Sequence, residues 1–539
     1  MNGGRTWLHV LAAAAILTAL NVTKAVHIDD QSYTVYGSEF AAHPRNPYGF
    51  EYGSPASHPA NQLLLPPVLP YWLGLGITIA GDDPVWLKIW LLPFALLLSG
   101  SVAVLAARFA PSIVGPLIWL GVLSPALLPG FNMMLEVPVL ALGLVAVAAA
   151  VRSVERNSWA LAALSGVLGG LAVQTKYTGA VSCAAATAWF VLNGRPGRAA
   201  LAAGLAAGIA VGWEWYLVSI QGESHFLVGF QQRKSNPFIR AVHIALPLLT
   251  QMAGLAAVIA LLGHAAAGRS QLRLRAAVII VLAAVATIGC LETQAALLVS
   301  ENGKTILAPS HVIYGVLALL VWSAIGGSCL QLAKSNDDRR MNWFLLVWLI
   351  LELGGYFALT PYPAARRLTG ALVVSTLILG RAAHLRSVDA RNAARIAVGG
   401  VLYSLLFFAA DWVDADAART AARRAAMSDH APAPGRTFRH LCWWGVAYYA
   451  DREGLQPLKA NRDMPRPGDL LAVHDIAELR AFTALPLPFR LDLIDTIEVG
   501  SDFPFRLVPG YYDGRTPLEG RRGDRCRIFI YRVVEHGSK

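Results

Sequence analysis

Two adjacent carboxylates, Asp29 and Asp30, follow the first long apolar run of the chain. An ionisable group at the edge of a bilayer needs water, an ion-pair partner or a chemical role. A carboxylate there could take a proton from an attacking hydroxyl group and so act as a general base. Both residues could instead be solvated acids at the end of a helix, and the residues alone leave this alternative open.

Three further residues with possible chemistry lie at the ends of apolar runs. Glu136 has only apolar neighbours in LLPGFNMMLEVPVL, whereas Lys176 and Tyr177 close a run in AVQTKYTG. A carboxylate at a helix start is also favoured by the helix dipole. A lone lysine at a bilayer edge can extend its ammonium group to water. Glu136 and Lys176 therefore each have a structural explanation beside the functional one.

Arg366 and Arg367 stand together in ALTPYPAARRLTG, before another apolar run. We place them on the side of the membrane where the positive-inside rule disfavours arginine. A guanidinium group matches phosphate geometry with two parallel hydrogen bonds. We therefore expect the pair to bind an anion. Together with the acids and Lys176, these residues predict a site at one membrane face that suits a lipid-linked phosphate.

The composition excludes a soluble enzyme. The chain has 539 residues, of which 55% are apolar and 15% are Asp, Glu, Lys or Arg, against about 25% charged residues in soluble domains. About thirteen apolar runs before residue 413 could each cross about 30 Å of hydrocarbon. They lie at 7–24, 85–107, 112–129, 132–151, 158–174, 178–193, 199–220, 241–266, 276–298, 308–333, 342–359, 368–385 and 396–413.

Basic residues predict the orientation, because cytoplasmic loops collect Lys and Arg. With the N-terminus inside, alternate loops share these residues, and an odd number of spans puts the C-terminal part outside. The first run could instead be a cleaved signal peptide, which leaves this orientation unchanged. The net charge of +11 comes from basic residues that lie between the apolar runs and do not cluster on one amphipathic face. Nucleic acid is therefore not an expected partner. The loop residues are Arg5, Arg108, Arg152, Arg156, Arg195, Arg198, Arg269, Arg273, Arg275, Lys334, Arg339, Arg340, Arg386, Arg391 and Arg395.

We predict a mainly α fold, a polytopic membrane helix bundle over residues 1–413, with a small external α/β domain over 414–539. Within the bundle, 25–83 should form an external catalytic loop with juxtamembrane helices, because prolines in LLLPPVLPYWLGLGITIAG disfavour a spanning helix. The tail alternates helix-like and strand-like pieces between turns such as PRPGD. Cys442 and Cys526 would share an oxidising compartment, so a disulfide and two free thiols both stay open.

No metal or cofactor site is predicted. Glu51, His58 and His311 could ligate a metal, but no ligand spacing supports this, and the five cysteines have no metal-like or redox-like spacing. The chain lacks a Gly-rich phosphate loop, so no bound nucleotide is expected. A divalent metal remains an open alternative, and no cofactor is expected with certainty.

Four segments resemble elements of the GT-C superfamily of integral membrane glycosyltransferases. The resemblance is especially to the branch of protein O-mannosyltransferases and aminoarabinose transferases, similar to glycosyltransferase family 39. IDDQSYTVYG is similar to the Asp-Glu motif after the first span, and PPVLPYWLGL to a Pro-Pro-Leu juxtamembrane element. MMLEVPVL is similar to an acidic position that opens a later span, and GLAVQTKYTG with PYPAARRL to Lys-Tyr and basic-loop elements. The resemblance covers most of the chain and implies thirteen spans with an external C-terminal domain.

The resemblance also implies roles for the individual residues. Asp29 matches the catalytic Asp of the superfamily, Asp30 stands where a Glu is usual, and Glu136 stands where an Asp is frequent. By this resemblance the donor phosphate would be bound by Lys176, Tyr177, Arg366 and Arg367, with the two arginines not distinguishable.

The implied activity is an inverting transfer of a hexosyl or pentosyl group from a polyprenyl-phosphate donor to a hydroxyl group. The acceptor would be a lipid, a glycan or a protein at the external face of a bacterial cytoplasmic (inner) membrane, with membrane lipids as further partners. Asp29 would act as base, and the cations would stabilise the charge that develops on the leaving phosphate. The main alternative is a multi-span transporter or flippase of lipid-linked or small polar substrates. Transporters usually carry ionisable residues near the bilayer midplane and often have repeated halves, which this sequence does not show.

Overall fold

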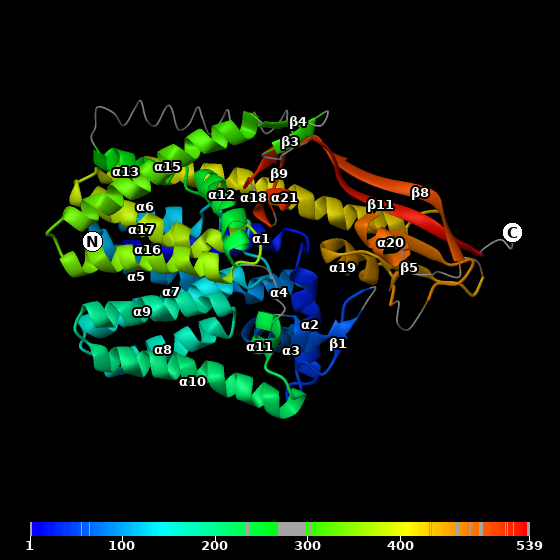
Figure 1. Ribbon diagram of the computed structural model, residues 1–539, viewed down its shortest axis with the longest axis horizontal. Helices are drawn as coiled ribbons and strands as arrows, with labels where there is room; N and C mark the ends of the chain where they lie inside the picture. Colours follow the sequence, from blue (N-terminus) through cyan, green and yellow to red (C-terminus); the bar gives the residue numbers. More distant parts are fainter. Residues whose placement is uncertain are drawn as a thin grey trace.

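The computed structural model is a bundle of long helices with a mixed sheet at one end (Figure 1). It describes residues 3–535 except 55–56, 64, 232–236, 268–297, 302–303, 308, 431, 433, 460–463, 475, 484–488, 513, 515 and 521. The N-terminus and the sheet lie at opposite ends of the bundle (Figure 1).

Long apolar runs form the helices of the bundle. These are α1 Gly3–Val22, α4 Pro84–Trp90, α5 Leu92–Phe109, α6 Val114–Val122, α7 Glu136–Glu155, α8 Trp159–Val173, α9 Ala180–Leu192, α10 Pro196–Gln221, α12 Pro237–Leu255, α13 Ala260–Ala267, α15 Pro309–Lys334, α16 Arg339–Leu359, α17 Thr369–Leu385 and α18 Ala390–Ala426. Single turns of 3₁₀-helix lie between several of them, namely η2 Pro111–Ile113, η3 Tyr177–Gly179 and η4 Ala365–Leu368.

Every predicted run is helical over most of its length except 276–298, of which residues 276–297 lie outside the described residues together with Arg269, Arg273 and Arg275. Among the described residues, eight helices are long and apolar enough to cross a membrane, and nine if α12 and α13, bent by 77°, form one span. The chain is therefore an integral, multi-pass membrane protein. The total of thirteen spans stays a prediction, since α6, α8 and α9 belong to apolar helices shorter than the spanning length.

The segment after α1 forms short elements beside the bundle end. They are α2 Asp30–Ala42, the hairpin of β1 Glu51–Tyr52 and β2 His58–Pro59, η1 Ala60–Gln62, α3 Val68–Ala80 and, later in the chain, α11 His225–Gln231. Helices α2 and α3 touch through their backbones, because a Cβ atom on Gly74 would lie 2.7 Å from the Gly37 carbonyl oxygen. With 13 residues, α3 is too short to span a bilayer.

The tail forms a five-stranded sheet in the order β6-β5-β7-β11-β8. Strand β5 is parallel to β6 and β7, whereas β11 is antiparallel to β7 and β8. The strand-like and helix-like pieces that the sequence predicts for the tail are present, with strands in DLLAVHD, LDLIDTIEV and RCRIFIYRVV and a helix in WWGVAYYADREG. The elements of the tail are β5 Phe438–Leu441, α19 Trp444–Arg452, β6 Gln456–Pro457, β7 Leu470–Val473, α20 Ile476–Thr483, β8 Phe489–Ser501, β9 Phe505–Arg506, α21 Val508–Tyr511, β10 Glu519–Gly520 and β11 Gly523–Glu535. A separate hairpin of β3 Leu298–Glu301 and β4 Lys304–Leu307 lies before α15 in the chain. Cys442 and Cys526 are buried free thiols.

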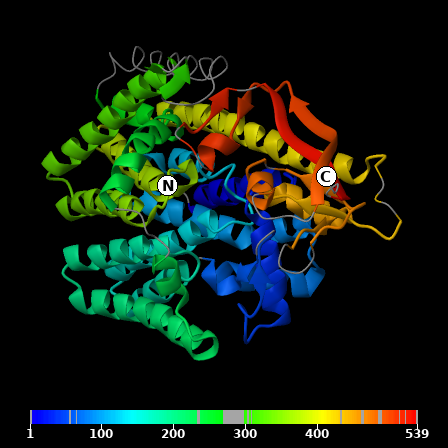
Figure 2. The same ribbon diagram turned by 45° about the vertical axis from the view of Figure 1, so that its right-hand side comes forward.

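Helix α18 joins the bundle to the sheet. It has 37 residues, about 55 Å at 1.5 Å per residue, and it contacts α6 in the bundle as well as α19, β8 and β11. Figure 2 shows the orange and red strands lying against it. The predicted domain boundary between residues 413 and 414 falls inside this helix.

Helices α7 and α17 are the most enclosed candidate spans, with 78% and 83% of their apolar windows buried. Glu136 opens α7, and Arg366 lies in the turn that leads into α17. The fold therefore fixes both side chains in the interior of the bundle, at the end that carries the sheet.

Candidate functional site

Arg366 is the centre of a cluster of charged side chains. Its Nη1 donates to Asp29 Oδ2 at 2.9 Å, and its Nη2 donates to the Tyr362 hydroxyl group at 3.1 Å. Its Nε lies 3.8 Å from Glu136 Oε1. The pair of Asp29 and Arg366 joins residues 337 positions apart in the sequence, so the predicted convergence of acids and bases is present in the fold.

Lys176 and Glu136 form the second ion pair of this cluster. The Lys176 ammonium group donates to Glu136 Oε1 at 2.9 Å, and both side chains are largely buried. Burial lowers the pKa of Lys176, while the Glu136 carboxylate opposes this shift. Glu136, which has no partner nearby in sequence, thus has cationic partners from two distant segments.

These side chains surround a cavity of about 220 Å³. Asp29, Glu136, Lys176, Tyr177, Arg366 and Arg367 all line it, together with Tyr33 and Tyr362. A smaller adjoining cavity of about 60 Å³ shares Glu136, Lys176, Arg366 and Arg367 and adds Glu352. The structure therefore gathers every predicted site residue except Asp30.

The positions of these side chains follow from helix ends. Asp29 precedes α2, Glu136 begins α7, and Lys176 lies in the connection between α8 and η3. The arginines lie in η4, after a loop with two prolines that ends α16. Because apolar helices end where the polar boundary begins, four segments far apart in sequence bring their charges to one level.

Asp30 lies outside the cavity. Its side chain is fully buried, and its Oδ2 accepts a hydrogen bond from the His27 backbone N–H at 3.0 Å. Burial raises the pKa of Asp30, and the nearby Lys88 ammonium group opposes the increase. The predicted catalytic role of Asp30 has no contact with the cavity to support it.

Tyr177 lines the cavity, but its hydroxyl group is engaged elsewhere. It donates to Glu214 Oε1 at 3.1 Å and lies 2.9 Å from His225 Nδ1. Arg367 places its guanidinium group 4.2 Å from the centre of the Tyr362 ring. Of the four predicted phosphate ligands, the cavity therefore offers the cations of Lys176, Arg366 and Arg367.

Sequence reasoning missed two tyrosines that line the cavity. Tyr362 stands four residues before Arg366 in the quoted PYPAARRL segment, so its proximity to the arginines could have been recognised. Burial alone would raise the pKa of Tyr362, but Arg367 and Arg366 hold it below its ordinary value. Tyr33 lies one helical turn after Asp29, and burial raises its pKa well above the ordinary value.

Within the described parts of the chain, no group of three or more His, Cys, Asp or Glu side chains could hold a metal ion. Of the three residues considered as ligands, Glu51 accepts a hydrogen bond from the Ser57 hydroxyl group at 2.9 Å. His58 is an exposed residue of β2, and the side chain of His311 lies outside the described residues.

The cavity has the charge balance of an anion site. It holds three cations, Lys176, Arg366 and Arg367, and two carboxylates, Asp29 and Glu136, which leaves one net positive charge. The Asp29 side chain is 34% exposed, whereas that of Glu136 is 8% exposed. A ligand that enters can therefore reach Asp29 directly, and a phosphate can compete with the carboxylates for the cations.

No protein-family model matches the chain, and no curated protein matches it in sequence. Among solved structures, it is similar to ArnT from Cupriavidus metallidurans bound to undecaprenyl phosphate, with 14% identity, a TM-score of 0.44 and 98% of both chains covered. It is similar to the oligosaccharyltransferase AglB from Archaeoglobus fulgidus, in complex with an inhibitory peptide and a dolichol-phosphate, with 14% identity, a TM-score of 0.43 and coverage of 86% of this chain and 61% of that one. For the mycobacterial arabinofuranosyltransferase AftD the identity is 14%, the TM-score 0.43 and the coverage 98% of this chain and 41% of that one.

Proposed function

We propose that the chain is a membrane glycosyltransferase that moves a sugar from a polyprenyl-phosphate donor to a hydroxyl group of a lipid, glycan or protein. The observation that carries this proposal is the contact of Asp29 with Arg366, 2.9 Å apart, in a cavity with one net positive charge. It combines a proton acceptor with a cation that can bind a leaving phosphate.

The donor phosphate would bind between Lys176, Arg366 and Arg367. A sugar phosphodiester carries one negative charge, which the net charge of the cavity balances. When the bond to the sugar breaks, the leaving phosphate gains a second negative charge. Cations that are already in place then bind the transition state more strongly than the donor, which lowers the barrier.

An apolar groove whose wall includes Gln174, two residues before Lys176, supports a lipid-linked donor. The groove has a volume of about 530 Å³ and lies between α3, α8 and α10, with Trp72, Leu171 and Trp213 in its walls. Gln174, which also lines it, accepts a hydrogen bond from the Val68 backbone N–H at 3.1 Å and stands two residues before Lys176. A polyprenyl chain in this groove would therefore bring its phosphate to the cationic cavity.

The transfer would proceed by inversion at the anomeric carbon. Once the phosphate binds Arg366, the Asp29 carboxylate is released from that guanidinium group and can accept the proton of the acceptor hydroxyl group. The acceptor oxygen forms the new bond to the anomeric carbon, the bond from this carbon to the phosphate oxygen breaks, and the phosphate leaves with the electron pair. In this scheme Glu136 orients Lys176 and Arg366, and Asp30 stabilises the turn that carries Asp29.

We place the reaction at the external face of a bacterial cytoplasmic membrane, the side on which the loop charges put the tail. Mass spectrometry of envelope lipids and glycans, with and without the gene, would identify the missing sugar. The full chain in proteoliposomes should then transfer that sugar from its polyprenyl-phosphate donor.

Asp29→Asn should abolish this transfer and keep binding of undecaprenyl phosphate, because the amide cannot accept the proton. Normal turnover of Asp29→Asn would remove Asp29 from the mechanism. Movement of the donor across the vesicle membrane without any transfer would favour the transporter instead.

A further inference from the structure

The residue before the proposed base has a strained backbone. Ile28 has a φ of 47°, a left-handed conformation that is unusual for a β-branched side chain. Such conformations persist only where the surroundings hold them, and they concentrate at functional sites. The contacts around the segment 24–28 therefore determine where Asp29 points.

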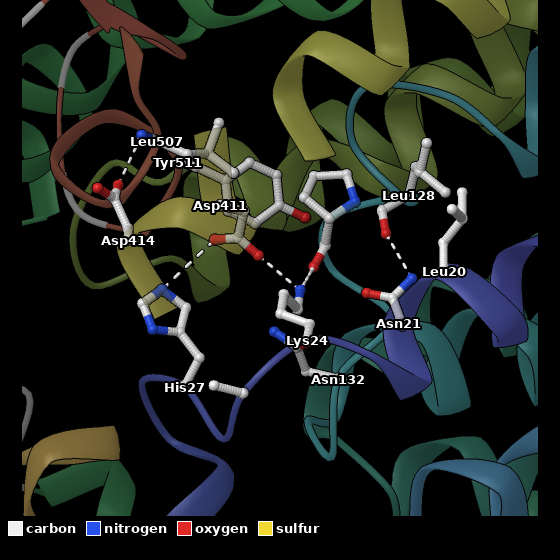
Figure 3. Close-up of polar contacts among 12 residues, drawn as sticks. Leu20, Asn21, Lys24, His27, Leu128, Asn132, Asp411, Asp414, Leu507 and Tyr511 are labelled. Carbon is white, nitrogen blue, oxygen red and sulfur yellow. Dashed lines mark hydrogen bonds and ion pairs between the residues drawn. The ribbon is translucent and has the colours of Figure 1, made fainter. Parts of the chain in front are cut away.

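Buried polar contacts hold this segment in place. The Lys24 ammonium group donates to Asp411 Oδ2 at 2.5 Å, as Figure 3 shows. It also donates to the Pro129 carbonyl oxygen at 2.6 Å. Both charged side chains, Lys24 and Asp411, are 0% exposed. The Lys88 ammonium group donates to the Lys24 carbonyl oxygen, and the Val26 backbone N–H donates to the Tyr449 hydroxyl group at 2.9 Å.

Asp411 also contacts the residue that supports Arg366. The Tyr512 hydroxyl group donates to Asp411 Oδ2 at 3.4 Å, and the Tyr512 ring centre lies 5.3 Å from the Arg366 guanidinium carbon. His27 contacts both groups. Its Nε2 atom lies 3.4 Å from Asp411 Oδ1 (Figure 3), and its ring forms a T-shaped pair with the Tyr512 ring, with 5.5 Å between the ring centres. A single carboxylate is therefore connected to both members of the Asp29–Arg366 pair.

Tyr512 belongs to the tail, which α18 anchors one turn after Asp411. Asp414 Oδ2 accepts the Leu507 backbone N–H at 3.0 Å, and Asp414 Oδ1 accepts from Arg525 Nη1 at 3.1 Å. Leu507 directly precedes α21, the helix that ends beside Tyr512. The tail thus reaches into the bundle and contributes an aromatic ring to the surroundings of Arg366.

We propose that Asp411 is a positioning residue, which through Lys24 and Tyr512 fixes the Asp29 carboxylate and the Arg366 guanidinium group in their reactive arrangement. This inference rests on the proposed function. Stability alone does not account for the pair of Lys24 and Asp411, because replacing a buried ion pair by apolar residues of similar volume is often neutral or stabilising.

The test is the double substitution Lys24→Met and Asp411→Leu in the full chain. Because both charges are removed together, no uncompensated buried charge remains, and we expect the melting temperature to be retained or raised. Binding of undecaprenyl phosphate should change less than about threefold, whereas the turnover number should fall about 100-fold, the effect of a small misplacement of reacting groups. A merely structural pair would leave the turnover number unchanged in the folded protein, and that result would overturn the proposal.

Asp337→Asn is the matched control. Asp337 Oδ2 lies 2.5 Å from Nη2 of the buried Arg381, before the start of α16, whereas the cavity lies at the other end of that helix, about 30 Å away. Its loss should leave donor affinity and turnover unchanged.

A readout without catalysis separates this inference from the proposed function. Asp29→Cys should react with a thiol reagent several times faster in the Lys24→Met and Asp411→Leu background than in the parent, with the reaction of the native cysteines subtracted. Faster labelling, combined with no sugar transfer by the parent chain, would refute the proposed function and leave the positioning role of Asp411 supported. Unchanged labelling would overturn the positioning role, whatever the activity.

Discussion

Glu136 determines how strongly the cavity attracts an anion, and Glu136→Gln tests this. The carboxylate lies 2.9 Å from Lys176 Nζ and 3.8 Å from Arg366 Nε. Two unit charges about 4 Å apart attract each other by roughly 4 kcal/mol at an effective dielectric constant of ~20. A donor phosphate must compete with this attraction, so the neutral amide should make phosphate binding stronger.

The expected change in phosphate affinity depends on how much of the attraction between Glu136 and its two cations becomes available to the phosphate in Glu136→Gln. A recovery of only ~1.4 to 2.8 kcal/mol would tighten binding of undecaprenyl phosphate about 10- to 100-fold. Without ligand, the same substitution leaves the buried Lys176 without its counter-ion, a change that typically costs ~3 to 5 kcal/mol of folding stability. The amide oxygen of Gln can still accept the Lys176 hydrogen bond, which places the expected loss at the lower end of that range.

The assay combines lipid binding with thermal unfolding of the purified chain in detergent. Glu136→Gln should melt at a lower temperature than the parent, and undecaprenyl phosphate should raise its melting temperature more than it raises that of the parent. Glu155→Gln is the control, because Glu155 ends the same helix, about 28 Å from Glu136, and is also ion-paired, with Arg152 at 2.9 Å. Weaker lipid binding by Glu136→Gln would refute the reasoning and would mean that Glu136 contacts the donor itself.

Two other predictions concern the cations and the orientation. Changing Arg366 and Arg367 together to Ala should weaken binding of undecaprenyl phosphate by at least tenfold, since charged hydrogen bonds to phosphate are lost; unchanged affinity in folded protein would reassign both arginines to packing. A cysteine in place of Arg490, whose side chain is 68% exposed on β8, should react with a membrane-impermeant thiol reagent on intact spheroplasts; reaction only after lysis would place the tail in the cytoplasm.

The helices, and the position of the site near the polar boundary of the membrane, could be predicted because both depend on local sequence patterns. Apolar runs give the helices, and a charge at the end of such a run must lie near the polar boundary. Glu136, Lys176 and Arg366 come from three such ends and meet in one cavity. Their pairing could not be predicted, because which helix ends are neighbours depends on how the bundle packs.

Asp29 faces the cavity and Asp30 does not, for a geometric reason. Successive residues at a helix start are rotated by about 100° around the axis, so Asp29 and Asp30 cannot face the same space. Asp29 lies on the cavity side and contacts Arg366, while Asp30 turns toward Lys88 and the His27 backbone. Two carboxylates side by side in sequence therefore indicate one cavity residue here, and the sequence does not say which of the two it is.

The sequence did not predict that the tail supports Arg366, for a different reason. Hydropathy locates the point where a helix leaves the apolar layer, which is near residue 413, but α18 continues to Ala426. Asp411 and Asp414, which look like the polar end of a span, are buried between the first segment of the chain and the tail. Because one rigid helix carries both contacts, the tail cannot be displaced from the bundle without disturbing the support of Arg366 by Tyr512. A truncation that removes the tail should therefore impair the cavity itself, although all of the residues that line the cavity lie before residue 413.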